Sequence, residues 1–428
     1  MSTKKRAAVV DGVRTPFVKA NGIFKKIDAD DLGAYVVREL LTRIPVKKEE
    51  IDELIFGNVI QPPDSTNIAR IIAVKGGLPV KVPAYTVNRN CASGLQAIVS
   101  AANQIELENS KIIIAGGSES MSHFPISFPD KMRDFLRNLN KSKTFWDKLK
   151  TFFTFRPSYI TPQLPEIKDP LCALTMGETA EVISRELHVT RKEQDEFALL
   201  SQNRAAAAQK SGRFAEEIVP IPIPPTFEKL QMIDDGIRDN QTIEQLSSLK
   251  PVFIKETGQV TAGNSSQITD GAVALLIMSD DEVKRRNLKP LGYITDTVSV
   301  ALEPSRMGLG PVYAISKLLK DNNLSINDID LIEINEAFAA QIVAIEKAFL
   351  SDDFAKKELG RDKAIGALDR NKLNVNGGAV AMGHPVGASG SRLVLTLLKE
   401  LKKRNLKRGI ATLCVGGGQG EAVLVEVE

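Results

Sequence analysis

The sequence predicts an α/β fold in which two similar halves flank an insertion. Short apolar runs alternate with longer amphipathic runs along the chain, as they do where strands alternate with helices. Corresponding segments recur in the same order toward both ends, and a proline-rich stretch separates the two sets. The chain has 428 residues, which is enough for about two or three domains.

Each half has the same expected order of elements around a glycine-flanked turn. In the first half these are strands over 7–10, 51–57 and 84–87, a turn that holds Cys91, a helix over 95–102 and a strand over 112–117. In the second half they are strands over 291–294 and 329–334, a turn over 387–390, a helix over 393–401 and a strand over 411–417.

An internal duplication explains this repeat, although any two α/β halves share some of it. Aligning the Ala-Ser-Gly at 92–94 with that at 388–390 makes Cys91 the counterpart of Gly387. We therefore predict an N-terminal half formed by 1–122 and 251–290, an inserted loop domain over 123–250 and a C-terminal half over 291–428. The insertion is rich in proline, including Pro162 and Pro165, and holds a helix-like run over 177–209. Ligand sites often form between such an insertion and a rigid core.

Composition excludes several classes of protein. The net charge of +3 is too small to indicate nucleic acid as a partner. The three cysteines form neither a disulfide framework nor a motif with zinc spacing, so we expect no metal site and a reducing, cytoplasmic compartment. We find no secretory signal and no run long enough to span a membrane.

Cys91 is the candidate nucleophile. It lies where an expected strand ends and a helix begins, a position that favours the thiolate by lowering the pKa of a thiol. Small residues follow at 92–94 and leave room for a substrate at the sulfur. The alternative is a buried structural cysteine, the more common role of an isolated one.

His384 and Cys414 supply the remaining chemistry. His384 is flanked by glycine and proline, and a neutral imidazole held there can take the thiol proton; the alternative is a loop histidine bonded to the backbone. Cys414 leads into the glycine-rich turn 416–420, whose N–H groups can bind an oxyanion and whose neighbouring thiol can act as acid and base. Asn335 follows an expected strand and can orient a water or a carbonyl oxygen.

Four ordered motifs resemble those of the thiolase family. They are Cys-Ala-Ser-Gly at 91–94, Asn-Glu-Ala-Phe at 335–338, Gly-His-Pro-Val-Gly at 383–387 and Cys-Val-Gly-Gly-Gly-Gln-Gly at 414–420. The resemblance extends over nearly the whole chain. It implies an α/β fold of five layers, αβαβα, with two duplicated halves and an inserted loop domain.

The resemblance also implies the role of each site residue. Cys91 attacks the 3-keto carbon of a 3-ketoacyl-CoA after His384 takes its proton. Cys414 protonates the departing acetyl-CoA carbanion and later deprotonates the incoming CoA. The backbone N–H groups of Cys91 and Gly416 form one oxyanion site, and His384 with a water held by Asn335 forms the other.

The implied activity is that of a 3-ketoacyl-CoA thiolase, an acyltransferase of fatty-acid β-oxidation. Coenzyme A is its co-substrate, no cofactor is bound permanently, and Ser266, Met176 and Phe338 correspond to residues that line the CoA and acyl tunnel. The alternatives are a short-chain acetoacetyl-CoA thiolase and a non-catalytic lipid-binding or scaffold protein of the same fold. A ketosynthase would be expected to carry histidine in place of Cys414.

Residues 128–155 predict an interaction surface. They hold seven basic and three acidic side chains among aromatic ones, including Trp146, the single tryptophan. A basic helix with an aromatic face fits a membrane interface or a partner protein, whereas packing on the core is the alternative. This region resembles β-subunits of the fatty-acid oxidation trifunctional complex, which implies a hydratase/dehydrogenase partner subunit. The family resemblance implies a homodimer or a tetramer.

Overall fold

A computed structural model describes residues 5–161 and 168–428, so Pro162 and Pro165 of the predicted insertion lie outside the described residues. The chain divides into two compact units. One consists of Phe124–Lys168, and the other contains the rest of the described chain, residues 169–250 included. The domain boundaries predicted from the sequence differ from these units and stay a prediction.

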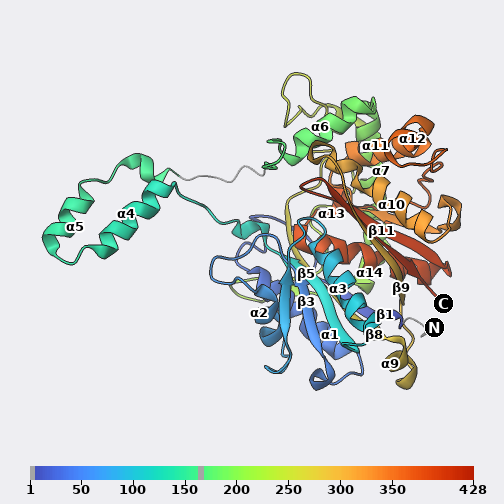
Figure 1. Cartoon of the computed structure of the whole chain (residues 1–428), viewed down its shortest axis with the longest axis horizontal. Coiled ribbons are helices and arrows are strands. Elements are labelled where there is room, and N and C mark those ends of the chain that lie inside the picture. The colour runs from blue at the N-terminus through green and yellow to red at the C-terminus, as the bar shows by residue number, and fades with distance from the viewer. Residues whose placement is uncertain (1–4, 162–167) are drawn as a thin grey trace. The chain divides into compact units, whose positions relative to one another are not determined.

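The main unit is built on one large sheet (Figure 1), which has ten strands in the part of the chain that the structure describes. Its strands are β1 Ala7–Arg14, β2 Val18–Lys19, β3 Glu53–Gly57, β4 Ala84–Val87, β5 Ile112–Glu119, β8 Thr269–Ser279, β9 Gly292–Ala301, β10 Leu331–Ile334, β11 Arg408–Val415 and β12 Gln419–Glu426. The order along the sheet is β10-β11-β12-β9-β1-β8-β5-β3-β4, and β2 pairs with β8.

The two halves of this sheet have the same pairing pattern. In the first, β3 is parallel to β5, β5 is antiparallel to β8, and β8 is antiparallel to β1. In the second, β10 is parallel to β11, β11 is antiparallel to β12, and β12 is antiparallel to β9. The halves join where β1 pairs antiparallel with β9. This correspondence supports the duplication inferred from the sequence.

Helices cover both faces of each half-sheet. They are α1 Ala29–Arg43, α2 Ile68–Lys75, α3 Ser93–Glu106, α9 Asp280–Arg285, α10 Gly310–Asp321, α11 Ala339–Leu350, α12 Asp352–Glu358, α13 Ala379–Met382 and α14 Val386–Arg404. Side chains of β8 alternate between two hydrophobic clusters, as the period of a strand requires. Leu276 packs with α1 and α2, whereas Leu275 and Ile277 pack with α3 and α14.

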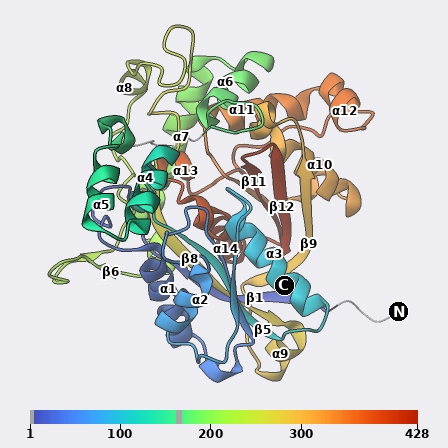
Figure 2. The same ribbon diagram turned by 60° about the vertical axis from the view of Figure 1, so that its left-hand side comes forward.

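Strand β12 alternates in the same way in the second half. Val423 packs in the cluster that contains α3 and α14, whereas Leu424 packs with α10 and α11. The order of layers is therefore α1 and α2, a half-sheet, α3 and α14, the other half-sheet, and α10 and α11 (Figure 2). This is the αβαβα arrangement that the resemblance implied.

The two central helices approach each other closely at their starts. A Cβ on Gly94 would lie 2.7 Å from Ser391 Oγ, and one on Gly390 would lie 2.5 Å from Leu95 N. Under the alignment that pairs Gly94 with Gly390, Leu95 pairs with Ser391, so the two contacts are equivalent by the duplication. Only glycine permits this approach, and it brings the segments before both helices to one place.

Residues 169–250 contain α6 Met176–Glu186, α7 Arg191–Lys210, β6 Ile221–Pro222, β7 Leu230–Gln231 and α8 Ile243–Ser247. The single helix-like run expected over 177–209 is wrong, because it forms two helices. The side chain of Thr190 caps α7, and His188 has a positive φ of 52° between the helices. Arg14 of β1 holds this region through buried ion pairs to Glu217 and Asp234.

The second unit is a helical hairpin. Its helices are α4 Asp130–Lys141 and α5 Phe145–Phe152, and Ser142 Oγ lies 3.1 Å from Thr151 Oγ1 between them. Phe135 is the buried centre of this unit and packs against Phe155, with ring centroids 5.3 Å apart. The side chain of Thr144 caps α5.

Candidate active site

Cys91 lies between β4 and α3, as expected, in a turn that its neighbours hold in place. Ser93 Oγ accepts a hydrogen bond from Arg89 N at 2.9 Å and donates one to Asn90 O at 2.7 Å. Asn90 has a positive φ of 42°, and its Nδ2 donates to Gly416 O at 2.8 Å. The nucleophile turn and the glycine-rich turn are thus joined directly.

The pKa of Cys91 differs from the sequence expectation. Burial raises the pKa of the thiol above its ordinary value, and the backbone N–H groups of Gly416 and Cys91 oppose that rise. The nearby Glu119 carboxylate raises the pKa further. The start of α3 therefore does not provide a resting thiolate, and a base is needed to form one.

His384 is buried between α13 and α14 and is held by both ring nitrogens. Its Nδ1 lies 2.6 Å from Ser389 Oγ, and Ser389 Oγ donates to Pro385 O at 3.0 Å. Its Nε2 lies 3.4 Å from Asn335 Nδ2. Because Ser389 uses its proton on Pro385, Nδ1–H donates to Ser389, which leaves Nε2 as the acceptor.

The environment keeps this imidazole neutral. Burial, together with the smaller effect of the Arg392 cation, lowers the pKa of His384 to about 4. The ring is held by the backbone before it, because Gly383 has a φ of 97° and a Cβ there would lie 2.2 Å from Thr269 Cγ2. The side chain is therefore a neutral acceptor in a fixed orientation, which is the state that a general base requires.

Cys414 lies near the end of β11 in apolar surroundings. It belongs to a hydrophobic cluster with Phe338, against which Met176 packs. Burial raises the pKa of the Cys414 thiol, the neighbouring Cys91 raises it further, and a hydrogen bond to Gln341 lowers it. The thiol is thus protonated at rest and can serve first as an acid.

The turn after Cys414 is tied to the inserted region. Gly417 N donates to the buried carboxylate of Asp169 at 2.7 Å. With Asn90 bonded to Gly416 O, the glycine turn is held on both sides. These contacts fix the peptide whose Gly416 N–H points to the Cys91 sulfur.

The residues expected to line the tunnel lie in the same neighbourhood. Ser266 N donates to Ala337 O at 2.9 Å, next to Phe338. Met176 begins α6, and a Cβ on Gly416 would lie 3.5 Å from its Sδ. Ser266 is therefore hydrogen-bonded to the segment that contains Phe338. Phe338 and Met176 pack in the same hydrophobic cluster as Cys414.

Sequence reasoning missed several side chains of this site. They are Asn90, Glu119, Asp169, Gln341 and Ser389. Glu119 at the end of β5 accepts hydrogen bonds from Gly387 N at 2.8 Å and Ile60 N at 3.0 Å. Burial raises the pKa of Glu119 to about 7. The one available signal was the match between Ser389 and Ser93 in the repeat.

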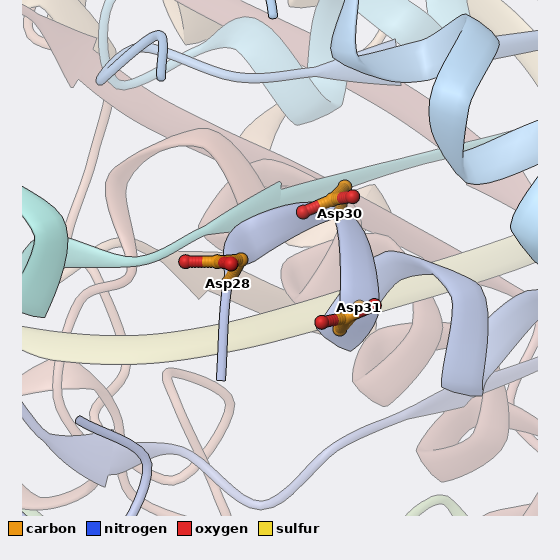
Figure 3. Close-up of side chains that lie close together, drawn as sticks. All are labelled: Asp28, Asp30 and Asp31. Atoms are coloured by element: carbon orange, nitrogen blue, oxygen red, sulfur yellow. The ribbon is translucent and has the colours of Figure 1, made fainter. Parts of the chain in front are cut away.

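An acidic group at the start of α1 is not assigned a metal. Within residues 5–161 and 168–428, the side chains of Asp28, Asp30 and Asp31 place carboxylate oxygens within 4.8 Å of one another (Figure 3). Lys75 Nζ lies 2.6 Å from Asp30 and 2.8 Å from Asp31, and His123 Nδ1 lies 3.3 Å from Asp28. These side chains are the partners of the carboxylates, so the cluster by itself does not indicate a metal ion.

Comparison with known proteins identifies the family. The family model for the thiolase N-terminal domain matches residues 7–281, and that for the thiolase C-terminal domain matches residues 288–427. The chain belongs to the thiolase family. The fold class and the enzyme class, an acyltransferase, are thereby confirmed.

Relatives of this thiolase match it over nearly its whole length. A 3-ketoacyl-CoA thiolase of Shewanella halifaxensis is 40% identical over 99% of this chain and 97% of its own. One of Yersinia enterocolitica is also 40% identical, with the same coverage of both chains. A Bacillus anthracis acetyl-CoA acetyltransferase superposes with a TM-score of 0.85 at 37% identity, covering all of both chains. Human mitochondrial 3-ketoacyl-CoA thiolase in complex with CoA superposes with a TM-score of 0.83 at 36% identity, covering 99% of this chain and 98% of its own.

Proposed function

We propose that this thiolase cleaves 3-ketoacyl-CoA with CoA, giving acetyl-CoA and an acyl-CoA shortened at its carboxyl end. The observation that carries the proposal is that the helix start after Cys91 packs against the segment after the neutral His384, while a second buried thiol, Cys414, neighbours Cys91. The 3-ketoacyl-CoA thiolases that match the full chain support the choice of substrate.

In the first step, His384 Nε2 takes the proton of Cys91, and the thiolate attacks the 3-keto carbon. The raised pKa of Cys91 and the neutral ring both fit this order, since a protonated thiol needs an acceptor. Negative charge then develops on the 3-keto oxygen. The backbone N–H groups of Cys91 and Gly416 are the proposed donors to it.

In the second step, the bond between C2 and C3 breaks and its electron pair goes to C2. The thioester oxygen of the departing enolate faces His384, now protonated, and the amide of Asn335, through a water. Cys414 gives its proton to C2, so that acetyl-CoA leaves and an acyl thioester remains on Cys91. A thiol with a raised pKa keeps that proton until the carbanion forms.

In the third step, CoA replaces acetyl-CoA. The Cys414 thiolate takes the proton of the CoA thiol, and the CoA sulfur attacks the acyl carbon. Cys91 leaves as a thiolate and recovers the proton held by His384, which restores the starting state. Coenzyme A is thus a co-substrate, and we propose Ser266, Met176 and Phe338 as lining of its tunnel.

Cleavage of short, medium and long 3-ketoacyl-CoA esters, with and without CoA, tests this proposal. Activity that extends to long chains supports a role in fatty-acid β-oxidation. Activity confined to acetoacetyl-CoA favours the short-chain enzyme, a reading supported by the likeness to an acetyl-CoA acetyltransferase. Absence of cleavage at every length, with folded protein, would reject the enzyme in favour of a lipid-binding or scaffold protein.

We also propose that the helical hairpin contacts an anionic membrane surface. Its most exposed aromatic side chains are Phe145, Trp146, Phe152 and Phe153, each at least 60% exposed. Residues 128–155 carry seven basic against three acidic side chains, a net charge of +4. Aromatic rings with surrounding cations favour a lipid interface. Among the described residues, no helix is long and apolar enough to cross a membrane.

Sedimentation of the protein with anionic and with neutral vesicles tests whether the hairpin binds an anionic membrane. Replacing Trp146 and Phe153 together by serine should abolish binding to anionic vesicles, whereas replacing the buried Phe135 tests only folding of the hairpin. Binding retained by the double variant contradicts the proposal. A hydratase/dehydrogenase partner subunit is the other candidate, and co-purification through the same surface would favour it.

The oligomer and the compartment are proposals from family resemblance and chemistry. We propose a homodimer or a tetramer, which light scattering of the full chain tests. The free cysteines Cys91, Cys172 and Cys414 fit a reducing cytoplasm, because an oxidised nucleophile would be inactive.

A further inference from the structure

Cys414 has a polar partner in surroundings that are otherwise apolar. Its Sγ donates a hydrogen bond to Gln341 Oε1 at 3.4 Å. The neighbouring hydrophobic cluster contains Ala180, Val260, Met307, Ala337, Phe338 and Ala340. Because a charge in apolar surroundings is costly, a thiolate at Cys414 requires a donor from the protein.

Gln341 is held in place by packing. It lies in the first turn of α11 and is 1% exposed. Its backbone N donates to Phe338 O at 3.1 Å. Its Cγ lies 3.5 Å from the position that a Cβ on Gly308 would occupy. The amide group is therefore presented to Cys414 by a buried and well-packed side chain.

The other end of this amide is available. Gln341 Nε2 is buried and has no hydrogen-bond partner among the described residues. A glutamine amide offers an acceptor oxygen and a donor nitrogen, and half a turn about its last side-chain bond exchanges them. Gln341 can thus accept from the Cys414 thiol in one orientation and donate to the Cys414 thiolate in the other.

We propose that Gln341 is the positioning residue that supports Cys414 in both of its protonation states. This inference rests on the proposed function, in which Cys414 alternates between acid and base. When the Cys414 proton moves to C2 of the departing enolate, Nε2–H turns to the thiolate left behind. When the CoA thiol returns a proton to Cys414, Oε1 accepts from it again. The amide itself gains and loses no proton.

Exchange of the C2 protons of acetyl-CoA with deuterated water reports proton transfer by Cys414 without thioester formation on Cys91. Gln341→Met keeps the shape of the side chain without a donor, and Gln341→Glu keeps the shape with a negative charge. We expect exchange to fall about 10- to 100-fold in Gln341→Met, as for loss of a hydrogen bond to a charged group. The limb of the pH profile that reports thiolate formation should move to higher pH in Gln341→Met, and further in Gln341→Glu, with KM little changed.

A second measurement requires no turnover. Ultraviolet absorbance of the thiolate, as the difference between each protein and the same protein carrying Cys414→Ser, follows the ionisation of Cys414 directly. The matched control is Gln194→Met, since Gln194 is also buried and also has one amide atom without a partner among the described residues. It should change neither the exchange nor the titration.

The outcomes separate this inference from the proposed function. Displacement of both pH profiles in the Gln341 variants but not in the control supports the inference. An unmoved titration and an unmoved exchange limb in folded Gln341→Met and Gln341→Glu overturn it. The wild type could cleave no 3-ketoacyl-CoA while the Gln341 variants still show the displaced titration of Cys414. That result would reject the proposed function and retain the pairing of Gln341 with Cys414.

Discussion

The first turns of the two central helices correspond in the repeat, although α14 begins at Val386 and α3 at Ser93, and these helix starts have diverged in chemistry. In the first half this position is Cys91, just before α3, and its sulfur accepts hydrogen bonds from the backbone N–H groups of Gly416 and of Cys91 itself. In the first turn of α14, the equivalent position is Gly387, whose N–H donates to Glu119 at 2.8 Å. One helix start thus lies at the proposed substrate site, and the other is occupied by a carboxylate of the protein.

The serine that follows each position has diverged as well. Ser93 bonds to Arg89 and Asn90 and holds the turn that carries Cys91, the proposed nucleophile. Ser389, its counterpart, bonds to Pro385 and to the ring of His384. The same residue in the same place of the repeat therefore stabilises a backbone turn in one half and orients a side chain in the other. In the proposed reaction, the two helix starts of the repeat therefore take different parts.

Of the substitutions at the two helix starts, loss of the Cys91 thiol should lower activity most. We expect Cys91→Ala to lower kcat more than about 1000-fold, because no other described group at that helix start can form the thioester. Thiolysis rates and mass spectrometry of the acyl-enzyme check this. The control is Cys172→Ala, whose cysteine lies in a loop before α6, and it should retain both activity and acyl-enzyme. Thioester that still forms in Cys91→Ala would place the nucleophile elsewhere.

The sequence predicted this site through short motifs, because each motif holds its reactive residue within a few residues of a chain turn. Cys91 before α3 and His384 before α14 follow from strand ends, helix starts and glycine spacing, which are local features. The alternation of apolar runs likewise predicted the half-sheets and the central helices. The five-layered arrangement followed from resemblance to the family.

Contacts between distant segments were not predictable in this way. Glu119 reaches Gly387 across 268 positions of the chain, and Asp169 reaches Gly417 across 248. No local pattern marks a buried carboxylate as the acceptor of a particular N–H. The lowered pKa expected of Cys91 failed for a related reason, since burial by distant segments outweighed the helix start.

The second prediction concerns the serine of the second half. Ser389→Ala should lower kcat about 10-fold with little change in KM, because the imidazole loses the partner that selects its tautomer. Loss of an acceptor also disfavours the imidazolium, so the pKa of His384 should fall further below its ordinary value. The pH dependence of acylation measures both effects.

Ser184→Ala is the matched control for Ser389→Ala. Ser184 is buried in α6 and donates to Ala180 O at 2.7 Å, the same bond to the residue four positions earlier that Ser389 makes to Pro385. Both variants should lose about 1 kcal/mol of stability. Only Ser389→Ala should lose activity, and equal activity in the two would contradict an orienting role for Ser389.

The third prediction concerns the carboxylate at the second helix start and an effect on stability, with none expected on the reacting groups. Burial raises the pKa of Glu119 to about 7, so the folded protein holds a proton there that the unfolded chain releases near pH 4.5. Stability from this group is therefore present at low pH and is lost as the pH rises toward 7, by roughly 3 kcal/mol at most. Glu119→Gln does not titrate, and its amide nitrogen cannot accept from the Gly387 or Ile60 N–H groups. The variant should be less stable than the wild type, with the difference largest below about pH 4.5 and narrowing up to about pH 7. Urea unfolding of both proteins across this range measures the difference. A difference that is constant with pH would show that folding does not raise the pKa of Glu119.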